Sequence, residues 1–580
     1  VLASTGIVAL ASGAVLRAIP ESRDHPLPVQ IARAAAPKLS GGAVAGAVVT
    51  ASDMGMRRLG LPTRPVINVL TAGAIGAAVA TISVWQRDRR AESMGIDDDS
   101  RKQVARPKGL KGVATALGMG VAGAGGLLGV AGLEFVVAEG TTRLVTKVLR
   151  RDEEVTPLVG HAVALAGMTV AGGYALEQVR RRVQHQDDVV EPAYPEPPRS
   201  PYVSAGPRSE VSFHEIGKEG RRFVTMATTA EQVSAVMGEP AVDPVRVVAG
   251  YESSREIAER AALAVNELDR LGGFERKAIL VAAPTGVGYV NYVVIEALEY
   301  LMRGDVATVV PQYALLPSAL ALDSTKEAVE LQRLVLEGIS RRLATMPDAR
   351  RPSLWQFGES LGAQVALDVV GDATTAKLLE LGVERGLYLG VPFRSRTWER
   401  WFERQGQVDP GKLLTLVSEP DDVDAATAAV RHLMVVHHDD PVNMFSYDAV
   451  VRPPWWLGEP ETRPPLVPRE TRYRPVTTFV LMLVDLKNGM NSKPGAFVRR
   501  GHDYRIDARA ALELAFGLRT TPEQAEAIEA QIRRSETDWA ARRLVARKFA
   551  RARNSVLSQL QSWGVDPADL DLDAITAGQL

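Results

Sequence analysis

The pattern of apolar and polar residues divides the chain into two halves of different character. Up to about residue 183, long stretches carry no charged side chain, whereas from about residue 212 short apolar runs alternate with amphipathic segments. The residues between them, 184–211, are rich in Pro, Ser and charge and show no apolar period, which is typical of an extended linker. We therefore predict a transmembrane helical domain over 1–183, a linker over 184–211 and an α/β domain over 212–580.

Three segments of the first part, 66–86, 113–138 and 155–176, are long and apolar enough to cross a bilayer as helices. The segment 1–19 is a fourth candidate, and 39–56 is a weaker fifth that either crosses or re-enters. Buried Ala- and Gly-rich helices of a soluble protein would have the same composition, but such segments rarely repeat within one region. We predict four to five membrane spans.

The distribution of basic residues predicts how these spans are oriented. The loop 87–112, between the third and fourth spans, is dense in Lys and Arg, so the positive-inside bias places it in the cytoplasm. Two further spans return the chain to that side, where Arg180, Arg181 and Arg182 follow the last one. The loop 139–154 also carries basic residues and weakens the contrast. We expect a multi-pass protein of the inner cell membrane, with the α/β domain facing the cytoplasm.

In the second part, apolar runs of strand length alternate with segments whose apolar residues recur at helical spacing. This alternation predicts an α/β fold, a mostly parallel sheet that is covered by helices on both faces. No internal repeat is visible. We expect strands within 245–251, 277–284, 306–313, 353–358 and 432–442, and helices within 254–272, 291–304, 326–346, 361–370 and 508–517.

Composition narrows the chemistry. Lys plus Arg (68) nearly balance Asp plus Glu (69), so no global charge favours nucleic acid as a partner. The chain has no cysteine, which excludes disulfides, a cysteine nucleophile and thiolate metal sites, but does not assign a compartment. Nothing in the sequence indicates a metal or a cofactor, and we expect neither.

The segment WQFGESLGAQ places Ser360 between Gly358 and Gly362, after the predicted strand 353–358 and before the predicted helix 361–370. In a glycine-rich chain this spacing alone decides little. On a sharp strand-to-helix turn, however, a serine stands above the sheet edge at a helix N-terminus, where negative charge is favoured. Strand, turn and helix together favour a nucleophile over a serine that merely caps a helix.

A serine nucleophile needs a base to take its proton and an acid to orient that base, and in this type of fold the chain order is serine, acid, histidine. Asp439 and Asp440 lie at the end of the apolar run 432–442, and only His502 is downstream of them. His502 falls in a loop before a helix, which suits the base. We prefer Asp440 as the acid, because Pro441 ends the strand and turns the side chain into a loop, with Asp439 as a close alternative.

A rival arrangement takes its acid from the segment SEPDDVD, at Asp421, Asp422 or Asp424, and uses His437 or His438 as the base. It would put the histidine on a strand, which is less usual for this chemistry. Otherwise the two histidines line or support the site from the end of that strand.

Acyl transfer also needs N–H donors for the oxyanion. In this type of site the residue after the nucleophile, here Leu361, supplies one donor, and a loop after an early strand supplies the other. The glycine-rich segment APTGVGYVN follows the predicted strand 277–284, so Thr285, Gly286 and Val287 are the candidates. A tight strand-to-helix turn is the plainer interpretation of this loop. It is no phosphate-binding loop, because no Gly-Lys-Ser/Thr follows.

Several segments together resemble one known family: TGVGYVN, PQYALLPSAL, FGESLGAQ, GVPFRSRTW, HHDDPV and GHDY. This family consists of bacterial membrane-anchored α/β-hydrolases. The resemblance implies an N-terminal α-helical transmembrane bundle followed by an α/β-hydrolase domain, with Ser360 as nucleophile, Asp440 as acid and His502 as base. At the acid the chain reads Asp-Asp-Pro where the family usually reads Ser-Asp-Pro, and this departure keeps Asp439 in consideration.

These expectations describe a membrane-embedded serine hydrolase that acts on esters. A membrane location favours lipid esters as substrates and membrane lipids as partners. The apolar segments 453–460 and 476–486, between acid and base, form either a lid or acyl-chain wall or ordinary core. Two alternatives stay open: an acyltransferase that uses the same three residues, and a membrane scaffold or transporter with a degenerate hydrolase domain.

Overall fold

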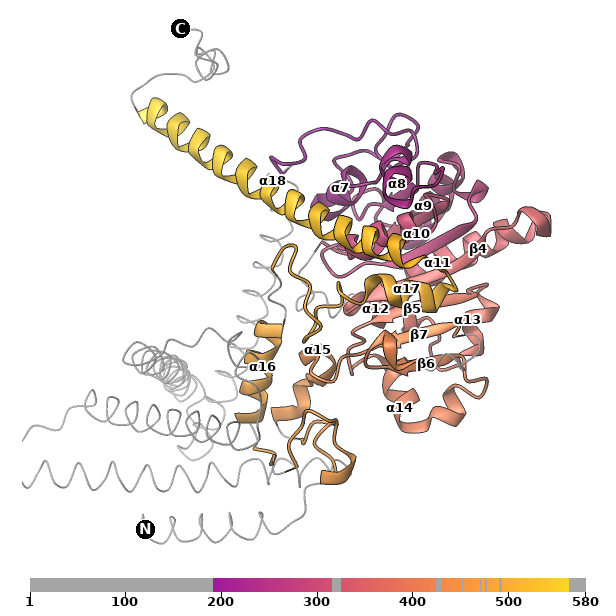
Figure 1. Cartoon of the computed structure of the whole chain (residues 1–580), viewed down its shortest axis with the longest axis vertical. Coiled ribbons are helices and arrows are strands. Elements are labelled where there is room, and N and C mark those ends of the chain that lie inside the picture. Colours follow the sequence, from indigo (N-terminus) through magenta and orange to yellow (C-terminus); the bar gives the residue numbers. More distant parts are fainter. Residues whose placement is uncertain are drawn as a thin grey trace, which may run out of the picture. The chain divides into compact units, whose positions relative to one another are not determined.

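The computed structural model describes residues 191–562, apart from 316–324, 424–429, 451, 470, 475–476 and 490–492. Figure 1 shows these residues in colour. The predicted membrane spans all lie within 1–183 and so fall outside the described residues. The chain divides into two compact units, one of Arg180–Ser446, Pro464–Leu466 and Asp485–Leu580, and one of Val1–Val179, Tyr447–Arg463 and Val467–Val484.

A seven-stranded sheet forms the centre of the first unit, in the order β1-β3-β2-β4-β5-β7-β6. Every neighbouring pair of these strands is parallel. Strands that are buried on both faces consist of continuous apolar residues, and β2 (Ala278–Ala283), with the sequence AILVAA, is buried throughout. The other strands are β1 (Val245–Ala249), β3 (Val306–Pro311), β4 (Ser353–Glu359), β5 (Arg385–Leu389), β6 (Leu414–Val417) and β7 (His432–Val435).

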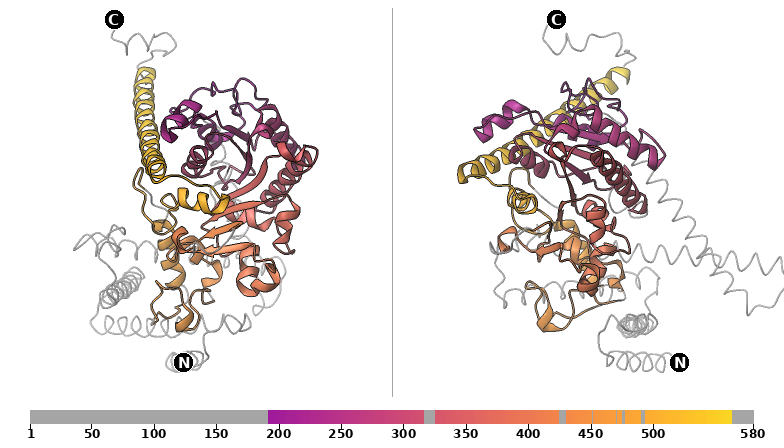
Figure 2. Two further views of the ribbon diagram at one scale, coloured as in Figure 1. Left: turned by 45° about the vertical axis from the view of Figure 1, so that its right-hand side comes forward. Right: turned by 90° about the vertical axis from the view of Figure 1, so that its right-hand side faces the viewer.

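Helices cover both faces of this sheet, as the two views of Figure 2 show. On one face α9, α11 and α12 pack on one another and on the strands, and on the other face α10, α17 and the start of α18 share an apolar core with them. The prediction of a parallel sheet covered on both faces is confirmed. The helices of this unit are α7 (Gly217–Thr225), α8 (Ala230–Met237), α9 (Ile257–Arg270), α10 (Tyr292–Leu301), α11 (Thr325–Ala344), α12 (Leu361–Asp368), α13 (Ala376–Glu380), α14 (Arg396–Val408), α15 (Pro441–Met444), α17 (Ala508–Phe516) and α18 (Pro522–Ser562).

The last predicted strand, 432–442, is shorter in the structure. Strand β7 ends at Val435, and the polar residues that follow form a turn. Asp440 begins the next helix, because its carboxylate accepts a hydrogen bond from the Val442 amide at 2.8 Å. An aspartate at the N-cap followed by proline is a favourable start for a helix, and it takes the end of this apolar run out of the sheet.

The side of the sheet on which the next strand is added changes between β2 and β4, which are parallel neighbours. From β2 the chain continues to β3 on one side, and from β4 it continues to β5 on the other. The ends of the two strands coincide, since Ala283 pairs with Gly358. In open parallel sheets, ligands bind beyond the carboxyl ends of the strands at such a switch point. The loop after β2 and the turn at Ser360 therefore meet at the edge where a site is expected.

The polar segment that we expected to be an extended linker is folded onto the first unit where the structure describes it, over 191–211. Tyr194 is buried, and Val203 forms a parallel bridge with Arg246 of β1. The described residues 191–211 show no apolar period because they form no helix or strand of their own. Only isolated side chains of this segment pack against the rest of the unit.

The described part of the second unit is a largely irregular segment. The guanidinium of Arg463 donates to several backbone carbonyls of the segment, and the Tyr473 hydroxyl donates to the Ala449 carbonyl at 3.0 Å. The apolar segments 453–460 and 476–486 fall largely in this unit. None of the helices that the structure describes is long and apolar enough to cross a membrane. The elements of this unit are η5 (Tyr447–Val450), η6 (Pro460–Thr462) and α16 (Thr477–Gly489), whose last residues belong to the first unit.

Candidate active site

Ser360 occupies the turn between β4 and α12 and is the N-cap residue of that helix. Its backbone has φ 56° and ψ −126°, and such a positive φ costs a non-glycine residue on the order of 1–3 kcal/mol. Two glycines make the turn possible. A Cβ on Gly358 would collide with the Gly362 carbonyl, and a Cβ on Gly362 would collide with the Ala283 carbonyl. The G-x-S-x-G spacing is therefore a steric requirement of this turn.

The end of β5 links the Ser360 turn to the loop that carries His502. The Ser360 amide donates to the Leu389 carbonyl at 2.9 Å. The next residue, Gly390, has φ 57°, and a Cβ there would lie 2.5 Å from Cε1 of His502. The imidazole ring of His502 thus packs directly on Gly390, the residue after the one that accepts the hydrogen bond of the Ser360 amide.

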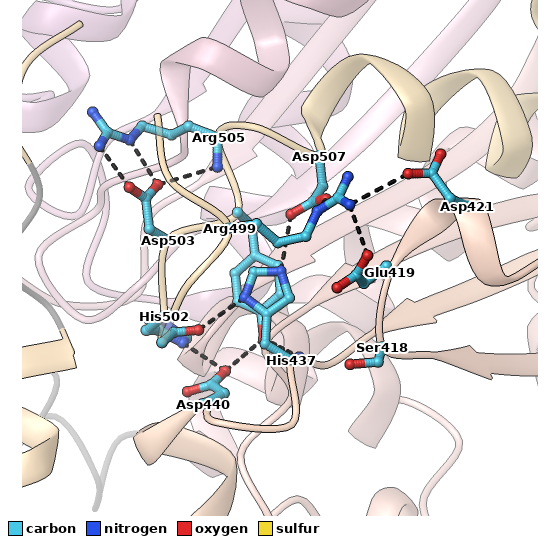
Figure 3. Close-up of polar contacts among 12 residues, drawn as sticks. Ser418, Glu419, Asp421, His437, Asp440, Arg499, His502, Asp503, Arg505 and Asp507 are labelled. Carbon is cyan, nitrogen blue, oxygen red and sulfur yellow. Dashed lines mark hydrogen bonds and ion pairs between the residues drawn. The ribbon is translucent and has the colours of Figure 1, made fainter. Parts of the chain in front are cut away.

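His502 and Asp440 form a buried hydrogen-bonded pair (Figure 3). Nδ1 of His502 lies 2.9 Å from Oδ2 of Asp440, and the two side chains are 7% and 0% exposed. Because the partner is a carboxylate, Nδ1 carries the proton and Nε2 is the basic nitrogen of the neutral ring. Nε2 makes no hydrogen bond to any residue that the structure describes. Among the described residues, none occupies the nitrogen that would take up a proton.

Asp440 is held by two further donors. The Tyr504 hydroxyl donates to the same Oδ2 atom at 2.6 Å, and the Val442 amide donates to Oδ1 at 2.8 Å. Tyr504 is itself fixed, because its oxygen accepts a hydrogen bond from the His437 amide at 3.1 Å. These bonds keep the carboxylate from rotating away from His502.

The charges within the pair determine its protonation states. Burial acts to raise the pKa of Asp440, but the charge of His502 and the hydrogen bonds from His502 and Tyr504 outweigh it, and the pKa falls below its ordinary value. Burial acts to lower the pKa of His502, but Asp440, with a smaller contribution from Glu359, raises it above the ordinary value. Asp440 is therefore a carboxylate at neutral pH and stabilises a protonated His502.

A second carboxyl group, that of Glu359, precedes Ser360 and interacts electrostatically with His502. Its Oε1 accepts a hydrogen bond from Nδ2 of Asn291 at 3.1 Å, and Asn291 in turn is the N-cap of α10. Burial is the main cause that raises the pKa of Glu359. Glu359 stands at a variable position of the G-x-S-x-G spacing, so the motif gives no signal for it.

Asp439, the alternative acid, is bonded to the backbone of the loop and not to the imidazole. Its Oδ1 accepts a hydrogen bond from the Gly501 amide at 2.9 Å. Asp439 thus fixes the residue before His502, while Asp440 fixes the ring itself.

His437, the rival base, forms a second buried pair, with Asp507 (Figure 3). Nε2 of His437 lies 2.9 Å from Oδ2 of Asp507, and Nδ1 lies 3.0 Å from the Gly501 carbonyl oxygen. Both nitrogens face oxygen acceptors, an arrangement that favours the doubly protonated, cationic ring. Burial acts to lower the pKa of His437, but Asp507 raises it above the ordinary value. A cation with both nitrogens engaged has no position left to take a proton from a serine.

The acids of the rival arrangement have other partners. Asp421 lies 3.3 Å from the guanidinium of Arg499, and the carboxylate of Asp422 accepts a backbone amide at 2.9 Å. Asp424 lies outside the described residues. His438 is exposed at the surface. In the part of the chain that the structure describes, neither histidine of the rival pairs with an acid of that segment.

Arg499 and Tyr504 complete the surroundings of the second pair. The guanidinium of Arg499 binds Asp507 at 2.8 Å and Glu419 at 2.7 Å. The Tyr504 ring stacks on His437 with the ring centroids 4.2 Å apart. Tyr504 thus contacts both His–Asp pairs. The sequence gives no signal for Arg499, Tyr504 or Asp507, because their partners are distant in the chain.

The predicted oxyanion donors lie at the carboxyl edge of β2 and β4. The Leu361 amide is in the first turn of α12, whose N–H groups have no acceptor within the helix. The amides of Gly286 and Val287 have no hydrogen-bond acceptor among the described residues. The Thr285 amide, in contrast, already donates to the Tyr289 carbonyl at 2.9 Å. Of the three loop candidates, Gly286 and Val287 are available and the Thr285 amide is not.

Nucleophilic acyl transfer requires a nucleophile, a buried base–acid pair and donors for the oxyanion. The described residues supply a strained serine at a helix N-terminus, a His–Asp pair whose Nε2 has no partner among them, and backbone amides without an acceptor among them. In the described part of the chain, no group of three or more His, Asp and Glu side chains is arranged to hold a metal ion. The parallel sheet and this arrangement at its switch point define the class of α/β-hydrolases.

Comparison with known proteins agrees with this class. A family model described as "Alpha/beta-hydrolase family" matches residues 245–528, and one described as "Alpha/beta-hydrolase family N-terminus" matches residues 27–227. The chain belongs to the alpha/beta-hydrolase family. A search of curated proteins and a search of solved structures gave no match. The resemblance to α/β-hydrolases is thus confirmed, whereas the membrane anchor and the bacterial origin remain predictions.

Proposed function

We propose that this protein is a serine hydrolase that cleaves carboxylic esters. Ser360 is the nucleophile, His502 the general base and Asp440 the group that orients and stabilises the imidazole. The observation that carries this proposal is the buried 2.9 Å bond between His502 and Asp440, made by a ring that packs on Gly390 beside the Ser360 turn.

The reaction proceeds in two halves. Nε2 of His502 takes the hydroxyl proton of Ser360 while Oγ attacks the ester carbonyl carbon, and the same proton then passes to the leaving alcohol. In the second half, His502 takes a proton from water while the water oxygen attacks the acyl carbon. The bond from that carbon to Oγ of Ser360 then breaks, His502 returns the proton to Oγ, and the carboxylic acid leaves. The raised pKa of His502 makes it a stronger base, so activity requires a pH above that pKa.

Backbone amides stabilise the oxyanion that forms in each half. The Leu361 amide supplies one donor and the amide of Gly286 or Val287 supplies the other. The N-terminus of α12 adds its positive dipole end at the same place. The Gly362 position supports this arrangement, because the close contact of its backbone with Ala283 brings the start of α12 against the end of β2.

The substrates we propose are lipid esters of a membrane in which the protein is embedded. This part of the proposal rests on the sequence, because four of the predicted spans lie within residues 27–227, the region that matches the N-terminal family model. Lipid esters are concentrated where such spans hold the enzyme.

The proposed location is the inner cell membrane, with the hydrolase domain on the cytoplasmic side. Because the chain has no cysteine, single cysteines near Ser100 and within 184–211 report their side through an impermeant thiol reagent. We expect neither site to react in intact cells and both to react after permeabilisation. Reaction of either site in intact cells would place the hydrolase domain on the other side.

A screen of membrane lipid extracts with the wild type and Ser360→Ala tests the function and identifies the substrate. We expect the wild type alone to release free fatty acid from an ester lipid. If the acyl group appears instead on an added acceptor alcohol, the enzyme is an acyltransferase with the same residues. Equal product patterns from both proteins would contradict a catalytic role for Ser360 and favour a scaffold or transporter.

A further inference from the structure

Helix α18 (Pro522–Ser562) is 41 residues long, and its packing on the sheet unit extends from its first turns to about Ala546, which contacts the small buried cluster around Tyr194. Ile528 and Ile532 are buried among the residues of the apolar core. From residue 541 onward, most of the described side chains are exposed. Figure 1 shows this helix, in yellow, extending away from the sheet and its covering helices. We call residues 541–562 the basic end of α18, for the reason that follows.

The basic end combines positive charge with exposed apolar side chains. No Asp or Glu occurs over 539–562. Leu544, Val545 and Phe549 are 49%, 52% and 71% exposed, and Val545 and Phe549, four residues apart, lie on the same helix face. Six basic residues lie on the same stretch. Arg543 is partly buried and interacts with Tyr292, and the other five are exposed, namely Arg542, Arg547, Lys548, Arg551 and Arg553.

The charges and the apolar residues together discriminate among the surfaces that this helix end would bind. A second copy of the chain would cover Phe549, but it would bring six further positive charges against the first six. Nucleic acid would neutralise the cations, but it would leave Val545 and Phe549 in water. An anionic lipid surface satisfies both, because apolar side chains enter the interface while Lys and Arg extend to the head groups.

We propose that the basic end of α18 binds the surface of a membrane that contains anionic lipids. Arg547, Lys548 and Arg551 are exposed and form no ion pair with a described residue, so nothing in that part of the chain competes for their charge. The interaction does not depend on the proposed hydrolase activity. It attaches the sheet unit to lipid through its own C-terminal helix, in addition to any membrane span earlier in the chain.

A single fluorescent label tests this directly, because the chain has no cysteine of its own. An environment-sensitive probe is attached to Ala552→Cys, on the face that carries Phe549, in the full chain reconstituted in vesicles. We expect blue-shifted emission and protection from iodide quenching when phosphatidylglycerol is mixed with phosphatidylcholine, and neither with phosphatidylcholine alone. The control label at Ala373→Cys, an exposed loop position, should respond to neither lipid. Equal signals from the Ala552 label in both vesicles would overturn the proposal.

Charge variants separate the lipid surface from other partners. Reversal of charge in Arg547→Glu, Lys548→Glu and Arg551→Glu should lower the ratio of lipid-inserted to water-exposed label at least about tenfold. The matched control, Arg547→Lys with Arg551→Lys, keeps the charge and should behave as wild type. Both variants should melt at the wild-type temperature, since the residues are exposed. A label that responds to protein concentration or to added RNA, but not to anionic lipid, would assign this end to a second copy or to nucleic acid and overturn the proposal.

Discussion

Two buried His–Asp pairs lie side by side around Tyr504, and they differ in what the second nitrogen of each histidine does. The distance from His502 to Asp440 and that from His437 to Asp507 are both 2.9 Å. The other nitrogen of His437 is bonded to the Gly501 carbonyl, whereas that of His502 has no partner among the described residues. The His437 ring is therefore held at both nitrogens, whereas the His502 ring keeps one nitrogen that, in the proposed function, accepts a proton.

This difference shows that the distance between a histidine and a carboxylate does not identify a catalytic pair. The His437 pair orders residue Gly501 from one side, and Asp439 orders the same residue from the other. Both interactions act on the residue immediately before His502. The His437–Asp507 pair therefore supports the His502–Asp440 pair. We expect disruption of the His502–Asp440 pair to lower turnover most, and disruption of the His437–Asp507 pair to lower stability.

The largest expected effect separates the two histidines by turnover. His502→Ala should lower ester turnover by a factor of about 10⁴–10⁶, because the proton acceptor is lost. His437→Gln should lower it at most about 100-fold, the range for groups that orient a site without reacting. Turnover of the lipid ester identified by the extract screen, or of a short-chain model ester, measures both. Full activity in His502→Ala with loss in His437→Gln would reverse the assignment and restore the rival.

Substitution of the two adjacent aspartates should lower turnover by amounts that differ almost as much as those of the two histidine variants. Asp440→Asn should lower turnover by about 10⁴, because the amide favours the wrong tautomer of His502 and no longer stabilises its charge. Asp439→Asn keeps an oxygen acceptor for the Gly501 amide, so turnover in this variant should fall by about tenfold or less. The ratio of the two losses is the decisive quantity. Similar losses in both variants would show that the acid has been misassigned.

A stability measurement tests the role of the His437 cation. His437→Gln should lower the free energy of unfolding by about 1–3 kcal/mol at pH 6, because two buried acceptors lose their donors. The pKa of His437 is raised in the fold, so its ion pair contributes in full below the ordinary value of 6.5 and is lost as the pH rises through the raised value. Urea unfolding should show the gap between wild type and variant narrowing towards pH 9. A gap that widens with pH would contradict this account.

The smallest expected effect concerns Glu359. This carboxyl group contributes to the raised pKa of His502, so Glu359→Gln should lower that pKa and move the acid limb of kcat/KM to lower pH. The value of kcat/KM at the optimum should change little, because Asp440 stays in place. Glu380→Gln, on the exposed surface of α13, is the matched control and should leave the limb unchanged. An unmoved limb in Glu359→Gln would show that this carboxyl does not act on the histidine.

The parts of the molecule that follow local rules could be predicted from the sequence. Continuous apolar runs alternating with helical spacing predict the parallel sheet, and Gly358 and Gly362 mark the turn because only glycine fits at both positions. The order of serine, acid and histidine along the chain favours His502 as the base, and this role remains a prediction. The sequence favours Asp440 over Asp439 only through Pro441 and the resemblance, because the contacts that separate the two aspartates, with the His502 ring and with the Gly501 amide, depend on the folded backbone.

Interactions between distant residues could not be predicted in the same way. Tyr504 and Asp507 act through His437 and Asp440, which lie more than sixty residues earlier in the chain. The expected strand 432–442 is too long because its polar residues, among them His437 and Asp440, bind the distant residues Asp507 and His502 and so leave the sheet. The segment 184–211 is typical of a free linker in sequence, because the buried residues of its described part, 191–211, are single contacts with no period.

The central claim is that Ser360 is a nucleophile activated by His502 and not by His437. Reaction of the folded full-length protein with a fluorophosphonate, followed by mass spectrometry, tests this claim most directly. We predict one adduct, on Ser360, that is absent in Ser360→Ala, slowed by at least about 10³ in His502→Ala and retained in His437→Gln. Absence of an adduct on the wild type, or an adduct that forms as fast in His502→Ala as in the wild type, would contradict the account.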